Sequence, residues 1–423
     1  MIKSLSKIVF EYLRIEKCNY VFIVNYLIIS YALFLPLSKG ITTMIEIIII
    51  SIWLIEGDFV NKYNKLKQSK FFIFLFVFLC FSSFSIFWSN DVAFAMDYLR
   101  KYWHFLLIPI IITSLQRKYI EHIFSAFLIG MFISEIVSYG IFFEVWTKDG
   151  ISASDPSPFM DHTNYSAFLA FTTFILIYRI LLSDNFKWKV IYTLYLISSF
   201  SNLFINGGRT GQIIFLVGII VIGFLHASNK LKTTIMTFLL SVLLFFSAYF
   251  VSPTFHDRMN YTFDDLKNMV LYDDYTNSFS ARIGLWIIGV KSSIDEPLLG
   301  TGIGDEARHT KQEIINLGLG YFIIENDKLC YVDYHNGFVQ YLVQLGFIGL
   351  FLFLTIFYYL FKMEINEMQY KDLKTVFIFL YLLWTMVGLT FHLNNSMLFF
   401  VLFSSIFTVL SLEQNQIYNK GVI

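Results

Sequence analysis

The feature that most constrains this chain is a series of apolar runs, each about 20 residues long, that recurs along its whole length. A helix of that length crosses a hydrocarbon layer about 30 Å thick, and it satisfies its backbone hydrogen bonds internally, as lipid requires. Only 15% of the residues are charged, against about 25% in soluble domains. A transmembrane β-barrel would instead show alternating segments of about 10 residues. We therefore predict an all-α, polytopic membrane protein.

About twelve of these runs are candidate transmembrane helices. Their approximate bounds are 20–38, 41–57, 70–89, 97–114, 120–143, 163–183, 187–205, 209–227, 232–251, 336–361, 373–392 and 396–412. If the N-terminus is cytoplasmic, Lys and Arg are concentrated in the loops and helix ends on the cytoplasmic side, which is the usual bias of membrane proteins. We therefore predict that both termini lie in the cytoplasm.

One connection, 252–335, is far longer than the others, and this topology places it outside the cell membrane. Long loops in compact proteins are usually functional or contain helices of their own. Its stretch SARIGLWIIGVKSSIDEP (280–297) is apolar with few charges, which predicts a helix lying at the membrane interface. One integral membrane domain thus has three parts: nine helices over 1–251, the loop over 252–335, and three helices with a cytoplasmic tail over 336–423.

Three residues fall on the external side, where the charge bias makes cations unexpected: Arg209 in NGGRTGQ, Arg282 at the start of the interfacial helix, and His335 before the tenth helix. The plain alternatives are that the arginines reach to lipid headgroups and that His335 caps its helix. The positive end of a helix lowers the pKa of a nearby histidine, and Asp333 acts in the opposite direction. A largely neutral His335 could accept a proton or orient a hydroxyl group.

Four further residues at external helix ends are candidates for substrate binding. They are Arg100 and Lys101 at the fourth predicted helix, His162 in DHTNYS, and Asn336 beside His335. For the first three, helix capping and headgroup contact is the alternative interpretation.

Two other patterns have an ordinary explanation and a functional one. GTGIGD (300–305) is only superficially similar to a nucleotide-binding loop because no strand pattern precedes it, and a tight turn with close backbone approach is the better interpretation. Glu46 and Glu135 lie within predicted spans, where carboxylates are often functional, and they weakly favour a proton-coupled transporter.

Several classes of site are not indicated. The formal net charge of zero gives no general attraction to nucleic acid. Cys18, Cys80 and Cys330 show no paired spacing, which argues against a disulfide framework or a zinc site. There is no carboxylate cluster of the Asp-x-Asp type, so we expect neither a metal nor a cofactor.

Three segments, taken in order, resemble the O-antigen ligase and polymerase superfamily of bacterial envelopes. They are GGRTGQIIFLVGII, ARIGLWIIGVKSSIDEPLLGTGIG and HNGFVQYLVQLGFIGL. The resemblance covers about 200–361, and the twelve-helix topology with its large external loop extends it. It implies a glycosyltransferase of the bacterial inner membrane whose donor is a glycan on undecaprenyl diphosphate in the periplasmic leaflet. By position, the family's two essential arginines correspond to Arg209 and Arg282, and its essential histidine corresponds to His335.

The resemblance further implies metal-independent transfer with inversion at the anomeric carbon, at a periplasmic active site. We favour a ligase, which moves the glycan to the lipid A core, over a polymerase, which joins lipid-linked repeat units. The expected partners are the lipid-linked glycan, the lipid A core and membrane lipids. The non-enzyme alternative is a transporter for lipid-linked glycans, which would show a polar path through the membrane and repeated halves.

Overall fold

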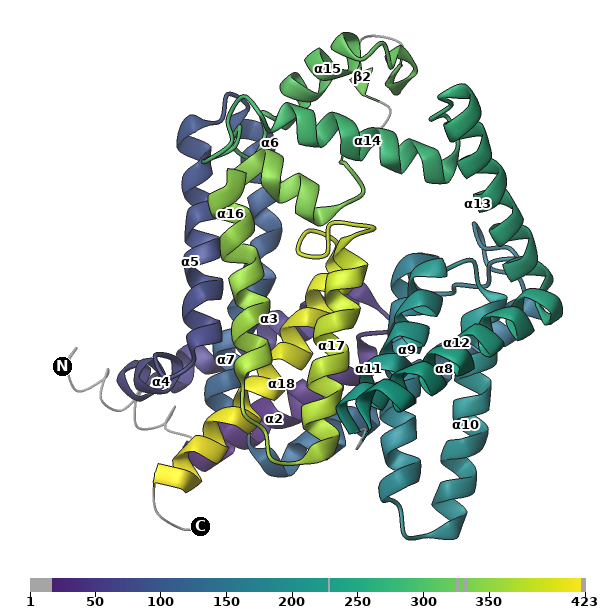
Figure 1. Cartoon of the computed structure of the whole chain (residues 1–423). Helices are drawn as coiled ribbons and strands as arrows, with labels where there is room; N and C mark the ends of the chain where they lie inside the picture. The colour runs from purple at the N-terminus through teal and green to yellow at the C-terminus, as the bar shows by residue number, and fades with distance from the viewer. Residues whose placement is uncertain (1–16, 227–228, 325–327, 330–332, 420–423) are drawn as a thin grey trace.

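The computed structural model describes residues 17–226, 229–324, 328–329 and 333–419, and it is built almost wholly of helices (Figure 1). The first part of the chain contains α2 (Lys17–Phe34), α3 (Lys39–Glu56), α4 (Phe59–Leu66), α5 (Lys70–Phe84), η1 (Ser85–Trp88), α6 (Val92–Arg100), η2 (Lys101–Leu106), α7 (Leu107–Ser114), η3 (Arg117–Tyr119), α8 (Ile120–Phe142), α9 (His162–Leu182), α10 (Phe186–Ile205), α11 (Arg209–His226) and α12 (Lys230–Val251). The long connection contains α13 (Pro253–Tyr272), α14 (Ser278–Ser292), α15 (Glu306–Asn316), η4 (Gly320–Phe322) and a short antiparallel pair, β1 (Ile323–Ile324) and β2 (Lys328–Leu329). The last helices are α16 (Gly337–Lys362), α17 (Met368–Thr385) and α18 (Asn394–Asn419).

Each predicted transmembrane run falls on helical structure, which confirms an all-α polytopic membrane protein. Within the described residues, seven helices are long and apolar enough to cross a membrane. They are Lys70–Trp88, Arg117–Phe142, His162–Leu182, Arg209–His226, Lys230–Val251, Gly337–Lys362 and Asn394–Gln414. The other predicted runs lie on helices that are shorter, more polar or interrupted, so twelve crossings stay a prediction.

Three predicted helices differ from the observed ones in extent. The fourth, 97–114, is interrupted by the 3-10 turn η2. The helix predicted at 280–297 ends early, because Pro297 and the polar residues before it do not support further helix. The eleventh, 373–392, also ends early, and Gly388 lies in the turn that leads to α18.

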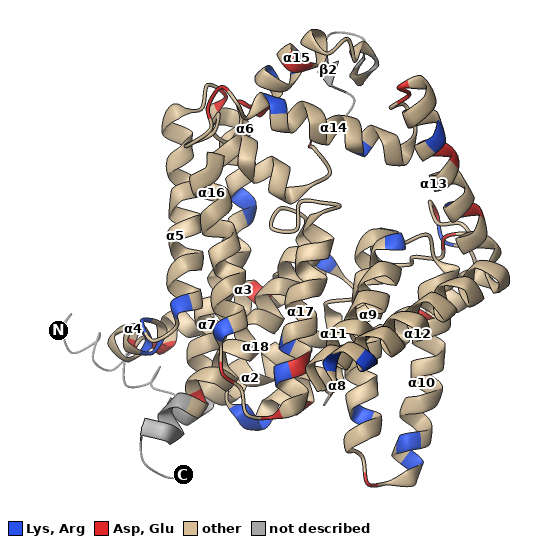
Figure 2. Ribbon diagram, in the orientation of Figure 1, with Lys and Arg blue, Asp and Glu red and all other residues tan. Residues whose placement is uncertain are grey.

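The two ends of the helix bundle carry different charge. Lys and Arg gather at the end that holds α4 and the α9–α10 connection, while α14 and α15 cover the opposite end (Figure 2). The start of α2 lies at the Lys- and Arg-rich end (Figure 1). We call the end covered by α14 and α15 the outer end.

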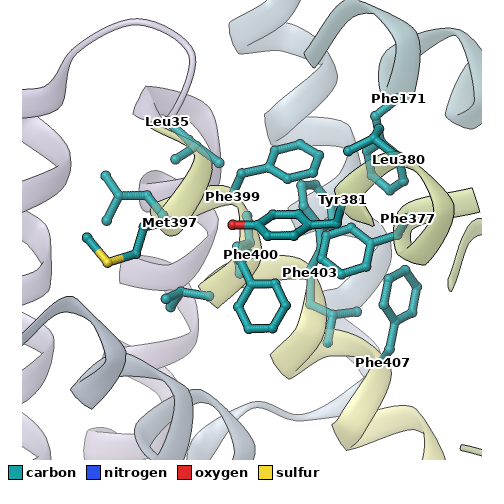
Figure 3. Packing of buried hydrophobic residues seen from close by; sticks show 14 of the residues in the cluster. Leu35, Phe171, Phe377, Leu380, Tyr381, Met397, Phe399, Phe400, Phe403 and Phe407 are labelled. Atoms are coloured by element: carbon teal, nitrogen blue, oxygen red, sulfur yellow. The ribbon is translucent and has the colours of Figure 1, made fainter. Parts of the chain in front are cut away.

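The core of the bundle is aromatic and centres on α18, whose apolar span is fully buried. Phe399, Phe400 and Phe403 of this helix pack against Phe377 and Tyr381 of α17 (Figure 3). Ring centroids lie 4.7 Å apart for Phe399 and Phe403 and 4.9 Å apart for Tyr381 and Phe400. Each large aromatic side chain buries roughly 150–250 Å², so these rings make α17 and α18 the rigid centre of the fold.

A second, smaller core lies at the outer end, where α14 packs on α15 and α16. Ala281, Leu285 and Ile288 point from α14 into this core, and Val339 and Val343 of α16 join it. These α14 positions recur at intervals of three and four residues, which is the spacing of one helix face. The interfacial helix expected from the sequence is therefore held by protein on its inner face, and it lies across the outer end from α13 towards α6 (Figure 1).

α16 is broken at Gly346, where φ is 63°. Segment 297–302 fills the break. The N–H groups of Thr301 and Gly302 donate to α16 carbonyls at 2.8 and 3.0 Å, and two α16 N–H groups donate to carbonyls of the segment at 2.8 and 3.2 Å. A Cβ at Gly346 would lie 2.3 Å from a backbone oxygen of the segment. Gly300 and Gly302 also have positive φ, which confirms the predicted tight turn with close backbone approach.

Candidate active site

The motif NGGRTGQ (206–212) forms a tight turn between α10 and α11. The Gly208 N–H donates to Asn206 Oδ1 at 2.8 Å, and the Gly211 N–H donates to Ser166 Oγ at 3.1 Å. A Cβ at Gly208 would lie 2.3 Å from one α9 carbonyl oxygen, and a Cβ at Gly211 would lie 2.1 Å from another. The glycines thus let the start of α11 pack directly on the start of α9.

Arg209 is the residue that this turn presents at the outer end. It is half-buried, and its Nη1 donates to Thr262 Oγ1 on α13. It lies within electrostatic range of Arg282 and Arg258, which repel it, and of Asp265, which attracts it. Guanidinium groups held near one another form a favourable place for a phosphate group, whose oxygens match the paired N–H donors.

Arg282 lies near the start of α14, and α13 fixes that start. Asp265 on α13 accepts the Phe279 N–H at 3.1 Å, which binds a backbone group that the first turn of a helix leaves open. The burial of Ala281 and Leu285 then sets the rotation of α14 about its axis. Arg282 is half-buried on this helix.

His335 immediately precedes α16 in a left-handed conformation, with φ 48°. The Asn336 side chain caps the helix by accepting the N–H groups of Phe338 at 2.9 Å and Val339 at 3.3 Å. Asp333 Oδ1 accepts the His335 N–H at 2.7 Å and lies 3.2 Å from the ring Nδ1. A proton on Nδ1 facing this carboxylate places the ring lone pair on Nε2.

The electrostatics of His335 favour the neutral ring. Burial lowers the pKa of His335 below its ordinary value of 6.5, Asp333 opposes this, and Arg282 lowers it further. At neutral pH the imidazole is therefore mostly uncharged and able to accept a proton. Arg282 lies within electrostatic range of both His335 and Arg209, so the structure brings the three predicted residues to one place at the outer end.

Arg100 and Lys101 lie where α6 meets η2, and they differ in their surroundings. Arg100 pairs with Asp97 at 2.8 Å, and both side chains are largely exposed, at 74% and 67%. An exposed pair of this kind contributes little to stability. Lys101 Nζ instead lies 2.8 Å from His392 Nε2, in the turn between α17 and α18.

Aromatic stacking connects Lys101 to the neighbourhood of His335. The His392 ring stacks on Tyr98, with ring centroids 3.9 Å apart. Tyr98 in turn lies within electrostatic range of Asp333. The His392 and Tyr98 rings therefore lie between Lys101 and the neighbourhood of His335. Arg100 instead points to the exposed Asp97.

His162 is the first residue of α9, and it lies beside the turn that carries Arg209. Its Nδ1 is 2.9 Å from Asp155 Oδ2, in the loop before α9. The other carboxylate oxygen of Asp155 accepts the Gly207 N–H at 2.9 Å. His162 and Arg209 are thus attached to the same small piece of backbone.

Sequence reasoning missed two residues of this region, Arg258 and Asp155. Arg258 on α13 lies within electrostatic range of both Arg209 and Asp155. The available signal for Arg258 was its charge, because it is one more cation in the long external connection. No sequence pattern indicated Asp155, because its contact is with the N–H of Gly207, which lies 52 residues further along the chain.

Glu306 is a third residue that the sequence did not single out. It is 5% exposed, and its Oε1 accepts from Gln344 Nε2 at 2.6 Å and from Gln340 Nε2 at 3.3 Å. Gln340 Oε1 accepts the N–H of Tyr334, the neighbour of His335, at 3.3 Å. Burial raises the pKa of Glu306, and the Gln344 hydrogen bond opposes this rise. The network ties the segment that carries His335 to α15.

The two intramembrane carboxylates are both engaged within the bundle. Glu46 is fully buried, with His104 Nδ1 at 2.6 Å and the Tyr31 hydroxyl donating at 3.3 Å. Glu135 accepts from two serine hydroxyls of α10 at 2.6 and 2.8 Å. His104 was not considered as a partner from the sequence, because the contact depends on η2 packing against α3.

Within the part of the chain that the structure describes, no group of three or more His, Cys, Asp and Glu side chains is placed to hold a metal ion. Cys80 is a free thiol on α5, and Cys330 lies outside the described residues.

Comparison with known proteins identifies one region of the chain. Residues 193–354 match the family model described as O-antigen ligase. This segment begins within α10 and continues past the break in α16, so it contains Arg209, Arg282 and His335. No curated protein matches the sequence. The chain is therefore a multi-pass helical membrane protein, and its residues 193–354 are similar to the O-antigen ligase family.

Proposed function

We propose that the protein is an O-antigen ligase that transfers a glycan from undecaprenyl diphosphate to the lipid A core oligosaccharide. The observation that carries this proposal is the convergence of Arg209, Arg282 and His335 at the outer end, from three separate segments of the matched domain. Two guanidinium groups and a neutral imidazole suit a reaction in which a diphosphate leaves and a sugar hydroxyl attacks.

In the proposed reaction, the acceptor hydroxyl oxygen forms a bond to the anomeric carbon of the donor sugar. The bond from that carbon to the diphosphate oxygen breaks, and its electron pair leaves with the diphosphate. His335 Nε2 takes the hydroxyl proton, since Asp333 faces Nδ1. Attack from the side opposite the leaving group inverts the anomeric centre.

Arg209 and Arg282 have the electrostatic role. Negative charge grows on the diphosphate as the bond breaks, and fixed donors near lipid stabilise such charge more than they would in water. A guanidinium group also stays protonated throughout and presents paired donors to phosphate oxygens. Because α13 contacts Arg209 and also fixes the start of α14, the two arginines are held in position before substrate binds.

The remaining candidates have secondary roles in this proposal. Lys101, beside His392, contacts charged groups of the acceptor, and Arg100 contacts headgroups or phosphate at the exposed edge. His162 contributes to the diphosphate side of the site. Asn336 acts on its neighbour, because its side chain caps α16 and so helps to place His335.

The location follows from the same proposal. We place the protein in the bacterial inner membrane, with both termini cytoplasmic and the outer end in the periplasm. The concentration of Lys and Arg away from α14 and α15 supports this orientation (Figure 2). Glu46 and Glu135 have hydrogen-bond partners inside the bundle, which favours a structural role for them over the polar path of a transporter.

A deletion strain tests the proposal. Its lipopolysaccharide would be run on a gel after complementation with the wild type, Arg209→Ala, Arg282→Ala or His335→Ala, and lipid-linked glycans would be extracted from the same cells. A ligase predicts core without O-chain and long glycans accumulating on undecaprenyl diphosphate in the deletion and in all three variants. Core capped with a single repeat unit would instead indicate a polymerase, and an unchanged ladder in the deletion would exclude both activities.

A further inference from the structure

A second group of charged side chains adjoins Arg209. Arg258 lies one helical turn before Thr262 on α13, and it is exposed. Thr262 connects the two arginines, because its Oγ1 accepts from Arg209 Nη1 and donates to the Arg258 carbonyl oxygen at 2.7 Å. Arg258 therefore lies on the stretch of α13 that contacts Arg209.

Asp155 links this group to the α10–α11 turn. Its two oxygens bond to the Gly207 N–H and to His162 Nδ1, each at 2.9 Å, and it lies within electrostatic range of Arg258. A Cβ at Gly207 would lie 3.1 Å from the carboxylate, so the turn packs closely on it. Burial of Asp155 works against its charge, but the bonds from His162 and Gly207 and the field of Arg258 lower its pKa overall.

The balance of charge in this region favours a polyvalent anion. Arg209 lies within electrostatic range of Arg258 on α13 and of Arg282 on α14, and both repel it. The two nearby carboxylates, Asp155 and Asp265, each accept a backbone N–H. Holding like charges together is unfavourable without a counterion, and a diphosphate ester presents negative oxygens on two phosphorus atoms.

We propose that Arg258, drawn towards the α10–α11 turn by Asp155, binds the second phosphate group of a lipid-linked diphosphate, while Arg209 and Arg282 bind the first. This inference rests on the proposed function for the nature of the donor. It adds a specificity that Arg209, Arg282 and His335 do not explain. With Arg258 in the site, the protein distinguishes a polyprenyl diphosphate from a polyprenyl monophosphate. Asp155 is a positioning residue in this arrangement.

Binding of two short-chain probes tests the inference. The full-length protein in lipid nanodiscs would be titrated with farnesyl diphosphate and farnesyl monophosphate by calorimetry. A charge-assisted hydrogen bond contributes about 1.5–3 kcal/mol, and 1.4 kcal/mol is tenfold in affinity, so Arg258→Ala is expected to weaken diphosphate binding by about tenfold or more. Monophosphate binding should change by less than about twofold. Lys267→Ala, an exposed cation on the same helix, is the matched control and should leave both affinities unchanged.

Asp155→Asn gives a second test. The inference predicts that this variant binds farnesyl diphosphate more weakly, whereas the loss of a negative charge alone would predict tighter binding. Removing a carboxylate near an anion site would strengthen binding if Asp155 merely added negative charge. If Asp155 positions Arg258, the variant weakens farnesyl diphosphate binding and lowers the preference of the protein for the diphosphate over the monophosphate. Asn keeps an oxygen for the Gly207 N–H, so the fold of the turn is retained.

The outcomes separate this inference from the proposed function. If Arg258→Ala binds farnesyl diphosphate as tightly as Lys267→Ala does, Arg258 has no part in the site and the inference fails. If Arg209→Ala abolishes binding while Arg258→Ala does not, the proposed function stands and only the inference fails. If the wild type does not bind farnesyl diphosphate, both the inference and the proposed donor are wrong.

Discussion

Two histidine–carboxylate pairs in this protein use the same chemical groups in opposite surroundings. In the inner pair, His104 and Glu46 lie 2.6 Å apart, with side chains 5% and 0% exposed. In the outer pair, His335 and Asp333 lie 3.2 Å apart, with side chains 36% and 26% exposed. The inner pair joins η2 to α3, whereas the outer partners are two residues apart in sequence.

The difference teaches that burial and neighbouring charge, more than the pair itself, decide what such groups do. The inner carboxylate also accepts from the Tyr31 hydroxyl, so its bonding is completed within the bundle. The outer histidine lies within electrostatic range of Arg282, beside a group of cations that suits an anionic substrate. We interpret the inner pair as structural and the outer pair as part of the chemistry, and four experiments examine this division.

The largest effect is expected for His335→Ala. A general base typically contributes about 10²–10⁴-fold to a rate, so glycan transfer by the purified protein should fall by at least that order. Thermal unfolding should change little, because the side chain is partly exposed. His309→Ala is the matched control, since His309 faces Asp305 at 3.8 Å on α15 and has no assigned role. Equal transfer by the two variants would remove His335 from the mechanism.

His104→Ala should show the opposite behaviour. Removing the His104 side chain leaves the buried Glu46 carboxyl group without its closest hydrogen-bond partner, and the expected loss in the free energy of unfolding is about 1–3 kcal/mol. Transfer per folded molecule should stay close to that of the wild type. The double variant Glu46→Leu with His104→Leu should recover much of the stability, because apolar groups of similar size are often tolerated in place of such a pair. A stable His104→Ala protein without activity would show that the inner pair takes part in the reaction.

Arg209→Lys and Arg282→Lys measure how far the outer end depends on geometry as well as on charge. Lysine keeps the positive charge but lacks the paired donors, and one charge-assisted hydrogen bond corresponds to roughly tenfold or more in rate. Each variant should therefore be about tenfold slower in transfer, with expression and unfolding unchanged. Arg308→Lys, on the exposed side of α15, should transfer at the wild-type rate. If Arg209→Lys and Arg282→Lys transfer glycan as fast as Arg308→Lys, the positive charge alone accounts for the contribution of the two arginines.

The smallest effect concerns pH. Burial and Arg282 lower the pKa of His335 below 6.5, while Asp333 raises it. Because a protonated ring cannot accept the hydroxyl proton, transfer should decline as pH falls through this lowered pKa. Asp333→Asn removes the group that raises the pKa, so the acid limb of the rate profile should move to lower pH. A limb that moves to higher pH, or does not move, would contradict the assigned coupling.

The sequence predicts the fold well where apolar runs dominate it. The runs that became α8, α9 and α12 are long and uninterrupted, and lipid leaves a helix as their favoured structure. Where polar contacts between distant segments determine the structure, the sequence does not predict it. The contact of His104 in η2 with Glu46 in α3, for example, is indicated by no local pattern.

The candidate site divides in the same way. Arg209, Arg282 and His335 are predicted as site residues because they lie in the motifs that resemble the family and on the side where cations are unexpected. Arg258 and Asp155 have no such motif, and their position follows from long-range contacts through Thr262 and Gly207. A sequence can indicate candidate reactive residues through motifs, while the residues that hold them in place are seen only in the packed structure.

The break at Gly346 has a mechanical consequence for the membrane. Below it, α16 is an ordinary span that tilts when the bilayer becomes thinner or thicker. Segment 297–302 bonds to α16 on both sides of the break, at 343–344 and at 347–348, and Glu306 accepts from Gln344, so the upper piece of α16 and the first turn below the break move with the outer layer. We expect spin labels at positions 342 and 287, which lie outside the second core, to keep their separation in lipids of different chain length, while a label at 358 shifts. The ring of His335 then keeps its position relative to the outer layer when the thickness of the bilayer changes.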